Sequence, residues 1–459
     1  MRQIALAAAL VVITEAAAAR AGGLQLASRG VRPTARGGAF VAGADDLGAL
    51  WFDPAGLALM AGGDSRRSFL FDVAYVAQSA EYTRIDSGFN VQPTVKNDAP
   101  GLPVPTLAAE VDLGKKLVLA GGLMAPYAGL GRYPQDGAQR YSLVDMSESL
   151  LLIMEVALAY QVSDKLRVGA GLQNMVFQLA STMVFSGCPG QTVCAPEDPE
   201  MDALGKISQL DWFSPSGVLG VQYDLARRLR VGAALQLPFW ISGKGHFETV
   251  LPDSGFYDGA SVVGDRADVS FTLPAIARAG IEAGLGARWK AELAGSIEFW
   301  SMHDDFDVQP RDVRIENAPG VGTYEIGPMN IPRHYRNTYS VHVGLEGQPL
   351  ASTPLRLLLG WSYETAAAPD AYLSVLTVDG ARNLLAGGLG WRHGRWTVDA
   401  MFGVVMVADR HVDPAVGVSP QLSPVRDDPE DPDPPRVYVN WGDYKSSWIM
   451  GGAGLSAGF

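Results

Sequence analysis

The sequence predicts an all-β protein, a 14-stranded antiparallel transmembrane β-barrel whose interior is filled by the N-terminal part of the chain. Three observations lead to this fold class. Long segments alternate between apolar and polar residues with a period of two, the period of a β-strand. Their connections alternate between short and long. The chain is 47% hydrophobic, yet after residue 21 it has no run of about eighteen apolar residues that could form a transmembrane helix.

The alternation is clearest in the segment 271–285. Every odd-numbered residue there is apolar, from Phe271 to Leu285, and the even-numbered residues include Arg278 and Glu282. The segments 289–300 and 355–364 repeat the pattern. Fourteen such segments are expected, at approximately 68–84, 103–113, 115–127, 148–162, 165–180, 211–224, 229–243, 270–286, 289–302, 336–348, 354–366, 381–393, 395–408 and 444–459. Most can cross a bilayer as tilted strands, which takes about 9–11 residues.

The connections between these segments follow a regular order. Short ones, such as 113–115, 163–165 and 393–395, separate long ones near 85–102, 128–147, 181–210, 244–269, 303–335, 367–380 and 409–443. Short periplasmic turns facing long external loops are typical of outer-membrane barrels. The sheet must also close, because an open edge in hydrocarbon would leave N–H and C=O groups without partners.

The first residues form a predicted secretory signal peptide. Arg2 gives a positive start, residues 4–13 are apolar, and Ala19-Arg20-Ala21 matches the small-x-small pattern of a cleavage site. Cleavage after Ala21 is expected, so the mature protein works outside the cytoplasm. The chain then divides into a signal peptide at 1–21, an N-terminal segment at 22–67 and a barrel at 68–459.

The charge of the chain argues against a nucleic-acid partner, because the net charge is −13 and the basic residues are not clustered. Acidic residues gather in the long loops, above all in the run 427–433. A solvated, proline-stiffened loop explains this run, and contact with divalent cations at a lipopolysaccharide surface is the alternative.

The two cysteines, Cys188 and Cys194, lie in one polar loop. In the oxidising compartment that a signal peptide implies, this spacing predicts a local disulfide. The loop supplies too few further ligands for a metal site, so no metal is expected.

The stretch from Gly22 to Met60 is too rich in glycine for a long helix and too apolar for a free linker. It therefore needs a cavity to lie in, which the barrel would provide. Near its end, the Asp53 carboxylate can accept from the free N–H groups of a following turn. Pro54 suits the first helical position, where a missing N–H costs nothing. A helix cap at Asp53 is favoured over a ligand role.

The same stretch resembles the N-terminal hatch of the FadL/OmpP1/TodX family, which are outer-membrane channels for long-chain fatty acids and other hydrophobic molecules. The residues that carry the resemblance are Gly23-Leu24-Gln25-Leu26, Arg36-Gly37-Gly38-Ala39-Phe40, Asp45-Asp46 and Asp53-Pro54-Ala55. Asp53 stands where the family has Asn, so the acceptor is kept and the amide donor is lost. Pro274, Arg278 and Gly280, Tyr363-Glu364 with Pro369-Asp370, and the ending at Phe459 resemble later family motifs.

The resemblance implies passive uptake of hydrophobic molecules across a bacterial outer membrane, without a cofactor. Long-chain fatty acids are the leading substrates, and aromatic hydrocarbons or terpenoids would also suit an apolar lumen. External loops would capture the ligand, and rearrangement near the hatch would release it, either sideways into the membrane or into the periplasm. Phe459 resembles the terminal aromatic signal read by barrel-assembly machinery. Outer-membrane lipid and lipopolysaccharide are the other expected partners, and a monomer is expected.

Ligand contacts are expected from apolar hatch residues and from the lumen. The apolar candidates are Phe40, Trp51, Phe52, Leu57 and Met60. Parity turns a set of charged residues inward: Arg278, Glu282, Lys290, Glu292, Glu298, Arg356 and Glu364. Either these form a paired network that fixes the hatch, or Arg278 or Arg356 meets a substrate carboxylate. Because each buried CH₂ contributes about 0.8 kcal/mol, an acyl tail alone could also supply the binding.

The third predicted strand contains Gly121 and Gly122 followed by Pro126, which can interrupt ladder pairing. The family resemblance implies sideways release through a wall gap at a kinked strand, and these three residues are the candidates for that gap. An equal alternative is that these glycines are merely tolerated in the barrel wall and mark no gap.

Two other functions stay open. A general porin for polar solutes is one, although an apolar plug argues against it. An outer-membrane enzyme that modifies lipids is the other. The six histidines are scattered through loops and strand ends, and no G-x-S-x-G motif appears, so no catalytic residue is assigned. The glycines at Gly387-Gly388 lack the context of a nucleotide site and are expected to relieve crowding in the wall or lumen.

Overall fold

The computed structural model describes residues 29–62, 66–129, 131–188, 194–195, 197–319, 322–422 and 436–459. The predicted signal peptide at 1–21, the start of the N-terminal segment at 22–28 and the acidic run 427–433 lie outside these residues. Among the described residues, no helix has the length and hydrophobicity needed to span a bilayer.

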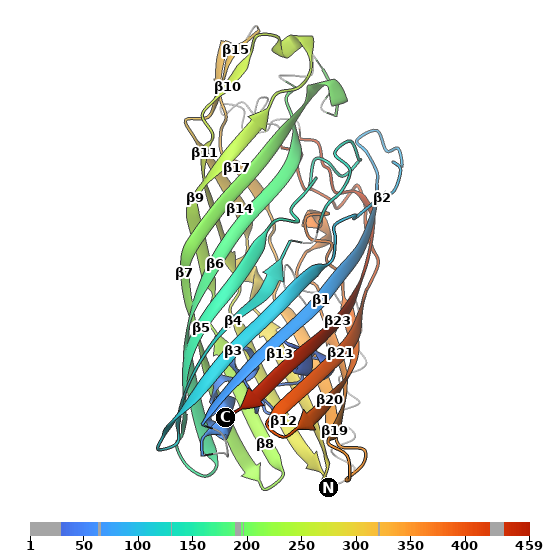
Figure 1. The fold of residues 1–459 in the computed structure, drawn as a ribbon. Helices are drawn as coiled ribbons and strands as arrows, with labels where there is room; N and C mark the ends of the chain where they lie inside the picture. Colours follow the sequence, from blue (N-terminus) through green and yellow to red (C-terminus); the bar gives the residue numbers. More distant parts are fainter. Residues whose placement is uncertain are drawn as a thin grey trace.

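The structure is a closed antiparallel β-barrel of fourteen strands, as the sequence predicts (Figure 1). In chain order, the wall consists of β1 (Arg67–Arg84), β3 (Leu102–Gly114), β4 (Leu117–Ala128), β5 (Leu150–Gln161), β6 (Leu166–Ser186), β7 (Asp202–Ala226), β8 (Leu229–Gln236) continued by β9 (Phe239–Val250), β11 (Arg266–Leu273) continued by β12 (Ile276–Leu285), β13 (Trp289–Glu298), β18 (Thr338–Gly347), β19 (Leu355–Glu364), β20 (Arg382–His393), β21 (Trp396–Val407) and β23 (Gly442–Gly458). The barrel closes because β1 pairs with β23, from Ser68 opposite Gly458 to Arg84 opposite Gly442.

The long connections carry the smaller elements. The strands are β2 (Val95–Lys96), β10 (Ser261–Val263), β14 (Asp305–Arg311), β15 (Arg314–Ala318), β16 (Gly322–Glu325), β17 (Met329–Pro332) and β22 (Arg410–Val412). Four short 3₁₀ helices join them, η3 (Pro199–Met201), η4 (Gly255–Tyr257), η5 (Trp300–Met302) and η6 (Asp370–Tyr372). Strands β14 and β17 extend the wall beside β11, and β10, β15 and β16 form a separate sheet at the upper end of Figure 1. The predicted disulfide joins Cys188 and Cys194 in one of these connections.

Two of the predicted strands are not continuous. The prediction of one strand over 270–286 with a single apolar face is wrong, because β11 ends at Leu273 and β12 begins at Ile276. Across this break the side-chain parity reverses: Leu273 and Ile276 are both buried, while Leu285 is exposed. Pro274 lies in the break and has no N–H to give to a ladder. Pro238 separates β8 from β9 in the same way.

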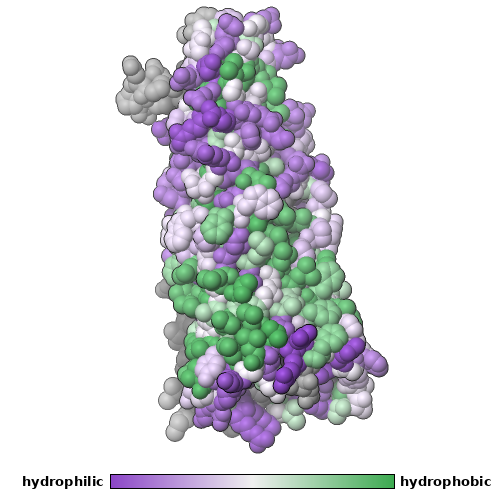
Figure 2. Space-filling model, turned by 60° about the vertical axis from the view of Figure 1, so that its left-hand side comes forward, coloured by the Kyte–Doolittle hydropathy of each residue, from purple (hydrophilic) through white to green (hydrophobic). Residues whose placement is uncertain are grey.

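The outward faces of the strands form an apolar band. Leu172 on β6 is 79% exposed and Leu219 on β7 is 55% exposed, and Trp212 and Trp240 are exposed near the outer end of the band. Figure 2 shows hydrophobic residues gathered in the lower part of one face, with hydrophilic residues above them and along the lower rim. Such a band is the surface that the hydrocarbon of a bilayer covers.

Residues 29–62, which are the described part of the N-terminal segment, lie inside the barrel. They form α2 (Val31–Ala35), α3 (Ala49–Phe52) and the 3₁₀ helix η2 (Pro54–Met60). Helix α2 contacts β1, β19, β20, β21 and β23, whereas η2 contacts β4, β5, β6 and β7. The segment therefore reaches opposite parts of the inner wall, in the lower half of the barrel (Figure 1).

Candidate functional site

Glycines on the inner wall let the N-terminal segment approach it closely. A Cβ added to Gly232 on β8 would lie 2.9 Å from the Cα of Ala42, and one added to Gly388 on β20 would lie 2.8 Å from the Cβ of Ala35. Any larger residue at these positions would require the segment to move. These wall glycines are therefore part of the seat that holds the segment, in line with the expectation that Gly388 relieves crowding.

Two arginines of the segment form a buried ionic network with the wall. Arg32 contacts Asp45 at 2.6 Å, Asp46 at 2.7 Å and Glu346 at 2.8 Å. Arg36 is fully buried and contacts Glu346 at 3.1 Å, Glu282 at 2.8 Å and Glu292 at 2.9 Å. Because each guanidinium has several carboxylate partners, the cost of burying these charges is offset, and breaking a single pair would leave an uncompensated charge.

Glu292 on β13 also binds the backbone of the segment. Its Oε1 accepts from the N–H groups of Val41 at 2.7 Å and Ala42 at 2.8 Å, and its Oε2 accepts from Gly43 at 3.1 Å. A carboxylate that accepts several backbone N–H bonds and a guanidinium bond is strongly held. Glu292 therefore fixes both the backbone and the charge of the segment.

The inward-facing charges fall into three groups. Glu282, Lys290, Glu292 and Arg356 belong to the network around Arg32 and Arg36. Arg356 is held by Glu346 at 3.2 Å and Asp399 at 2.7 Å, so its guanidinium is already occupied. Glu364 pairs with Arg382, and Glu298 accepts from the indole N–H of Trp300. Arg278 makes no ion pair in the described part of the chain, and its Nη2 donates to Gln236 at 3.3 Å.

The motif Asp53-Pro54-Ala55 forms the helix cap that its sequence predicts. Asp53 precedes η2, Pro54 occupies its first turn, and the Asp53 Oδ1 accepts from the Ala55 N–H at 3.0 Å. The Oδ2 is buried and has no hydrogen-bond partner among the described residues. Burial raises the pKa of the Asp53 carboxyl well above its ordinary value, because the charged form is poorly solvated there.

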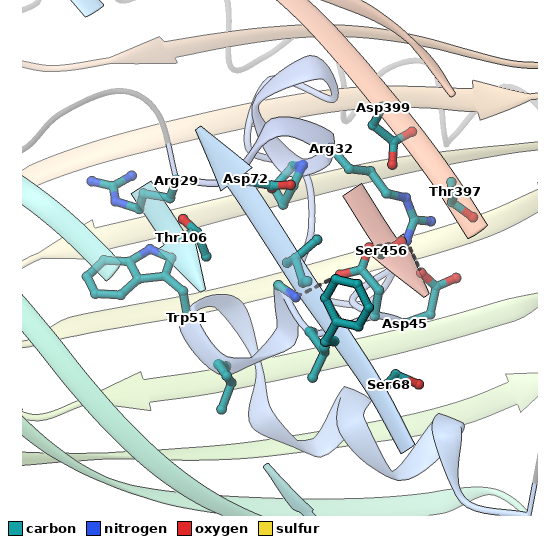
Figure 3. Close-up of a pocket in the computed structure, with 18 of the residues that line it drawn as sticks. Arg29, Arg32, Asp45, Trp51, Ser68, Asp72, Thr106, Thr397, Asp399 and Ser456 are labelled. Atoms are coloured by element: carbon teal, nitrogen blue, oxygen red, sulfur yellow. Dashed lines mark hydrogen bonds and ion pairs between the residues drawn. The ribbon is translucent and has the colours of Figure 1, made fainter. Parts of the chain in front are cut away.

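A cavity of about 320 Å³ lies between the N-terminal segment and the wall. Its lining comes from the segment (Arg29, Arg32, Leu50, Trp51 and Met60), from β3 and β4 (Val104, Thr106, Met124, Ala125 and Pro126) and from the ends of β19, β21 and β23 (Arg356, Asp399 and Ser456). Figure 3 shows Arg29 and Trp51 together on one side of this cavity beside Thr106, with Arg32, Asp45 and Asp399 on the other. The cavity thus has an aromatic end and an ionic end.

Trp51 lies between two arginines at the aromatic end. The guanidinium carbon of Arg29 is 5.1 Å from the centroid of the indole, and that of Arg278 is 4.9 Å from it. Five buried donor atoms around this ring have no hydrogen-bond partner among the described residues: Arg29 Nε and Nη2, Arg278 Nη1, Trp51 Nε1 and the Tyr127 hydroxyl. Tyr127 is within electrostatic reach of both arginines. Buried donors almost always have an acceptor, and these five have none among the described residues.

The apolar candidates for ligand contact lie in three environments. Trp51 and Met60 line the 320 Å³ cavity. Phe52 lines a second, smaller cavity of about 40 Å³, which Arg29 and Arg278 also line. Phe40 is fully buried and packs edge-on against Phe52 at 5.7 Å, and Leu57 is fully buried in the core of the segment. The structure thus brings Trp51, Phe52, Met60 and Arg278 to cavities and uses Phe40 and Leu57 for packing.

The wall beside the cavity is interrupted. The β3–β4 ladder runs from Gly114–Leu117 to Thr106–Met124, and no further pair joins these strands in the described residues. Pro103 and Pro105 on β3 and Pro126 on β4 have no N–H, which explains why pairing ends there. Of the three predicted kink residues, Pro126 lies in the interrupted part. Gly121 and Gly122 lie in the regular ladder, and Gly122 makes room for Leu50.

Several residues of the site were not singled out in the sequence. Arg29, Arg32 and Arg36 follow one another at spacings of three and then four residues, which places them on one helical face and is a signal in the sequence. Tyr127 gave no such signal, because it follows Pro126 at the point where β4 stops pairing with β3. Its inward orientation depends on that interruption.

Comparison with known proteins agrees with this architecture. A family model described as outer membrane protein transport protein (OMPP1/FadL/TodX) matches residues 10–419. A FadL homologue of Pseudomonas aeruginosa is 16% identical with a TM-score of 0.76, and the match covers 95% of this chain and 100% of that one. No curated protein matches the chain.

Two toluene transporters of known structure are also similar. TbuX of Ralstonia pickettii is 18% identical with a TM-score of 0.61, and TodX of P. putida is 16% identical with a TM-score of 0.63. Each match covers 95% of this chain and 99% of the other. At these identities the likeness shows a shared fold. Since the family model covers most of the sequence, the chain belongs to the OMPP1/FadL/TodX family of transport proteins of the bacterial outer membrane.

Proposed function

We propose that this protein is a channel for the passive uptake of hydrophobic small molecules across the outer membrane. The observation that carries the proposal is the 320 Å³ cavity, which lies between the N-terminal segment and an interrupted stretch of wall. A cavity lined by Leu50, Trp51, Val104 and Met124 suits an apolar ligand. The N-terminal segment acts as the hatch, because it closes the lumen at this level.

The leading substrate is a long-chain fatty acid. The unpartnered donors of Arg29, Arg278 and Tyr127 favour a ligand that brings a carboxylate, since guanidinium groups bind carboxylates in a planar, two-point geometry. The apolar lining takes the tail, and each buried CH₂ adds about 0.8 kcal/mol. Arg278 and Arg29 are the headgroup residues in this proposal. Arg356 instead fixes the segment, because two carboxylates already hold it.

A neutral aromatic hydrocarbon is the second candidate substrate. It is favoured by the similarity to proteins named as toluene transporters and by the indole of Trp51, which presents an aromatic surface to the cavity. Such a ligand has no acceptor for the N–H and O–H donors around Trp51, so water would have to bind them. The two candidates therefore differ in whether they need Arg29 and Arg278.

The exit that we propose is the gap between β3 and β4. The cavity is lined by Met124, Ala125 and Pro126, which flank that gap. The alternative exit is the periplasmic end, where Ser456 and Gly458 also line the cavity. The ion pairs of Arg32 and Asp399 lie at that end. They disfavour the exit of an apolar molecule there, because the molecule would separate these charges from their partners as it passed.

Uptake by cells that lack their own transporter tests this function. We expect the wild-type protein in the outer membrane to increase uptake of labelled dodecanoate or hexadecanoate. Trp51→Glu should abolish the gain, whereas Trp51→Phe, which keeps an aromatic ring, should retain most of it. Arg278→Gln should reduce uptake of the fatty acid and leave toluene uptake unchanged. A folded wild-type protein that increases uptake of neither fatty acid nor toluene would refute the proposal.

A further inference from the structure

The periplasmic end of the barrel is basic, although the chain as a whole carries a net charge of −13. The six short turns that join wall strands at this end contain seven Lys or Arg residues and one acidic residue, Asp164. Each of the seven long connections at the other end contains more acidic than basic residues. The basic residues of the turns, called here the basic rim, are Lys115, Lys116, Lys165, Arg227, Arg228, Arg288 and Arg395.

The side chains of the basic rim are all exposed. Among the described residues, Lys116 is the only one of the seven with an ion pair, to Asp164 at 3.6 Å. Arg395 lies over the ring of Phe459, 4.5 Å from its centroid. One exposed lysine or arginine needs no explanation, but five of the six turns carry at least one. The basic rim therefore presents positive charge around most of the periplasmic end.

The backbone holds these turns side by side at the lower end of the barrel in Figure 1. In four of them the carbonyl of a basic residue accepts an N–H from the next hairpin: Lys116 from Gln161 at 3.0 Å, Lys165 from Asp224 at 2.9 Å, Arg228 from Gly284 at 2.9 Å and Arg288 from Gln348 at 3.0 Å. The positions of the charges are thus fixed by the closed sheet.

The turn between β3 and β4 has lysine where the backbone favours other residues. Lys115 has a φ of 53° and Lys116 a φ of 69°. A two-residue hairpin turn with positive φ at both positions is usually Asn-Gly, Asp-Gly or Gly-Gly, because a longer side chain crowds the backbone there. Turn formation therefore does not explain the two lysines, which points to a use for their charge.

Aromatic side chains place the basic rim at the level of lipid headgroups. Tyr160 is opposite the residue that follows Lys116, and Tyr223 is opposite the residue that follows Lys165. Both tyrosines are exposed, at 43% and 39%. Outer-membrane barrels carry a girdle of aromatic residues at each membrane interface. The turns next to these tyrosines therefore lie among the headgroups of the periplasmic leaflet.

We infer that the basic rim binds anionic phospholipids of the periplasmic leaflet. The phosphate of the headgroup accepts from the Lys and Arg side chains, and the acyl chains lie against the apolar band above. A lipid with net negative charge is favoured over a zwitterionic one, whose own cation the basic rim repels. Charges spread around the whole rim suit many small headgroups better than one folded partner. This surface lies outside the lumen, and the inference is independent of the proposed uptake function.

Lipid retention by the full-length protein tests the inference. The protein is reconstituted in nanodiscs of nine parts dioleoylphosphatidylcholine and one part dioleoylphosphatidylglycerol and is then extracted in a mild detergent. Mass spectrometry quantifies the lipid that stays bound. We expect phosphatidylglycerol to be enriched roughly fivefold or more over its share in the disc. Extraction in about 0.5 M NaCl should lower the enrichment, because salt screens exposed charges.

Variants assign the enrichment to the basic rim. The rim variant, which combines Lys115→Gln, Lys116→Gln, Arg227→Gln and Arg228→Gln, should retain the two lipids in nearly the ratio of the disc. Exchange of cation for cation, in Arg227→Lys with Arg228→Lys, should keep the wild-type enrichment. The matched control removes four exposed cations from the extracellular end and should also keep it: Lys96→Gln, Arg132→Gln, Arg266→Gln and Arg311→Gln.

Three results would overturn the inference. The wild type could retain the two lipids in the ratio of the disc. The rim variant could keep the enrichment in a protein that has the gel mobility of a folded barrel. The rim variant and the control variant could also lose the enrichment equally, in which case the net charge of the protein and not the basic rim would select the lipid.

Discussion

Gly37 of the N-terminal segment and Gly360 of β19 meet backbone to backbone inside the barrel. A Cβ on Gly37 would lie 2.6 Å from the backbone nitrogen of Trp361, and a Cβ on Gly360 would overlap the backbone nitrogen of Gly37. Gly37 also has a positive φ of 65°, which favours glycine. The position of the segment therefore depends on two residues that have no side chain.

Gly360→Ala should displace the segment and open the lumen. The added methyl group has no room, and overpacking of this kind costs about 1–3 kcal/mol. We expect a higher leak conductance in planar bilayers than for the wild type. Gly387→Ala on the neighbouring strand is the control, because its Cβ would meet atoms at 3.4 and 3.5 Å, an ordinary contact distance. Equal conductance of the two variants would contradict the role of Gly360.

Glu292→Gln should loosen the segment without changing the barrel. The substitution leaves Arg36 with less negative charge and weakens the bonds to Val41 and Ala42. Removing one member of a buried ion pair costs about 3–5 kcal/mol.

Trypsin digestion of the folded protein measures this effect, since we expect cleavage after Arg36, which Gly37 follows, to become faster. Glu316→Gln breaks a partly exposed pair with Arg314, which should cost less than about 1 kcal/mol, and serves as the control. Unchanged digestion of Glu292→Gln would argue against its anchoring role.

Closing the gap between β3 and β4 should block exit of the ligand. Thr106 and Met124 form the last pair of the β3–β4 ladder at the edge of the gap, so the pair Thr106→Cys and Met124→Cys should form a disulfide that keeps the gap from widening. Uptake should fall in the oxidised protein and recover on reduction. The control is Ala109→Cys with Gly121→Cys, which lie opposite each other in the intact ladder. Full uptake by the cross-linked wall would favour the periplasmic exit.

Asp379 should make the extracellular loops less stable as the pH rises. Its carboxylate is buried and accepts from the N–H groups of Ala367 at 2.9 Å and Ala368 at 2.7 Å. Burial raises its pKa to about 7. A folded state with a raised acid pKa keeps a proton that the unfolded chain has released. The free energy of unfolding of the loops therefore falls by at most about 4 kcal/mol between about pH 4 and pH 7. It stays at the lower value above pH 7.

Hydrogen exchange of residues 366–380 at pH 5 and pH 8 measures this dependence. We expect faster exchange at pH 8 in the wild type, beyond the intrinsic effect of pH. Asp379→Asn, which remains neutral and keeps an acceptor, should abolish the difference. If the variant and the wild type respond equally to pH, another group is responsible.

Asp53→Asn should be neutral or stabilising at pH 8. Asn keeps the acceptor for the Ala55 N–H and removes the charge that burial disfavours. Because the raised pKa costs stability only as the pH increases, the advantage of Asn should grow from pH 5 to pH 8. Asp53→Ala loses the cap and should cost about 1 kcal/mol. Thermal unfolding of the three proteins at both pH values gives the comparison.

The sequence alone determined the wall of the barrel. Side-chain parity is a local property, so a period of two over ten or more residues fixes where strands lie and which residues face inward, as for Glu282, Lys290 and Arg356. The helix cap at Asp53-Pro54 was predictable for the same reason, since cap and helix are adjacent in the chain. Parity failed where Pro238 and Pro274 interrupt the strands and where the ladders shift register, between Asp211 and Ser214 on β7 and between Met124 and Tyr127 on β4, because a change of register depends on the neighbouring strands.

The tertiary structure decided what the inward-facing residues do. Arg278 and Arg356 were equivalent candidates in the sequence. Closure of the barrel brings Glu346 and Asp399 to Arg356, whereas no carboxylate of the described residues lies within 4 Å of the Arg278 guanidinium. Partners such as Arg36 and Glu346 are 310 residues apart in the chain. Such contacts follow from strand register and the path of the N-terminal segment, which no local pattern encodes.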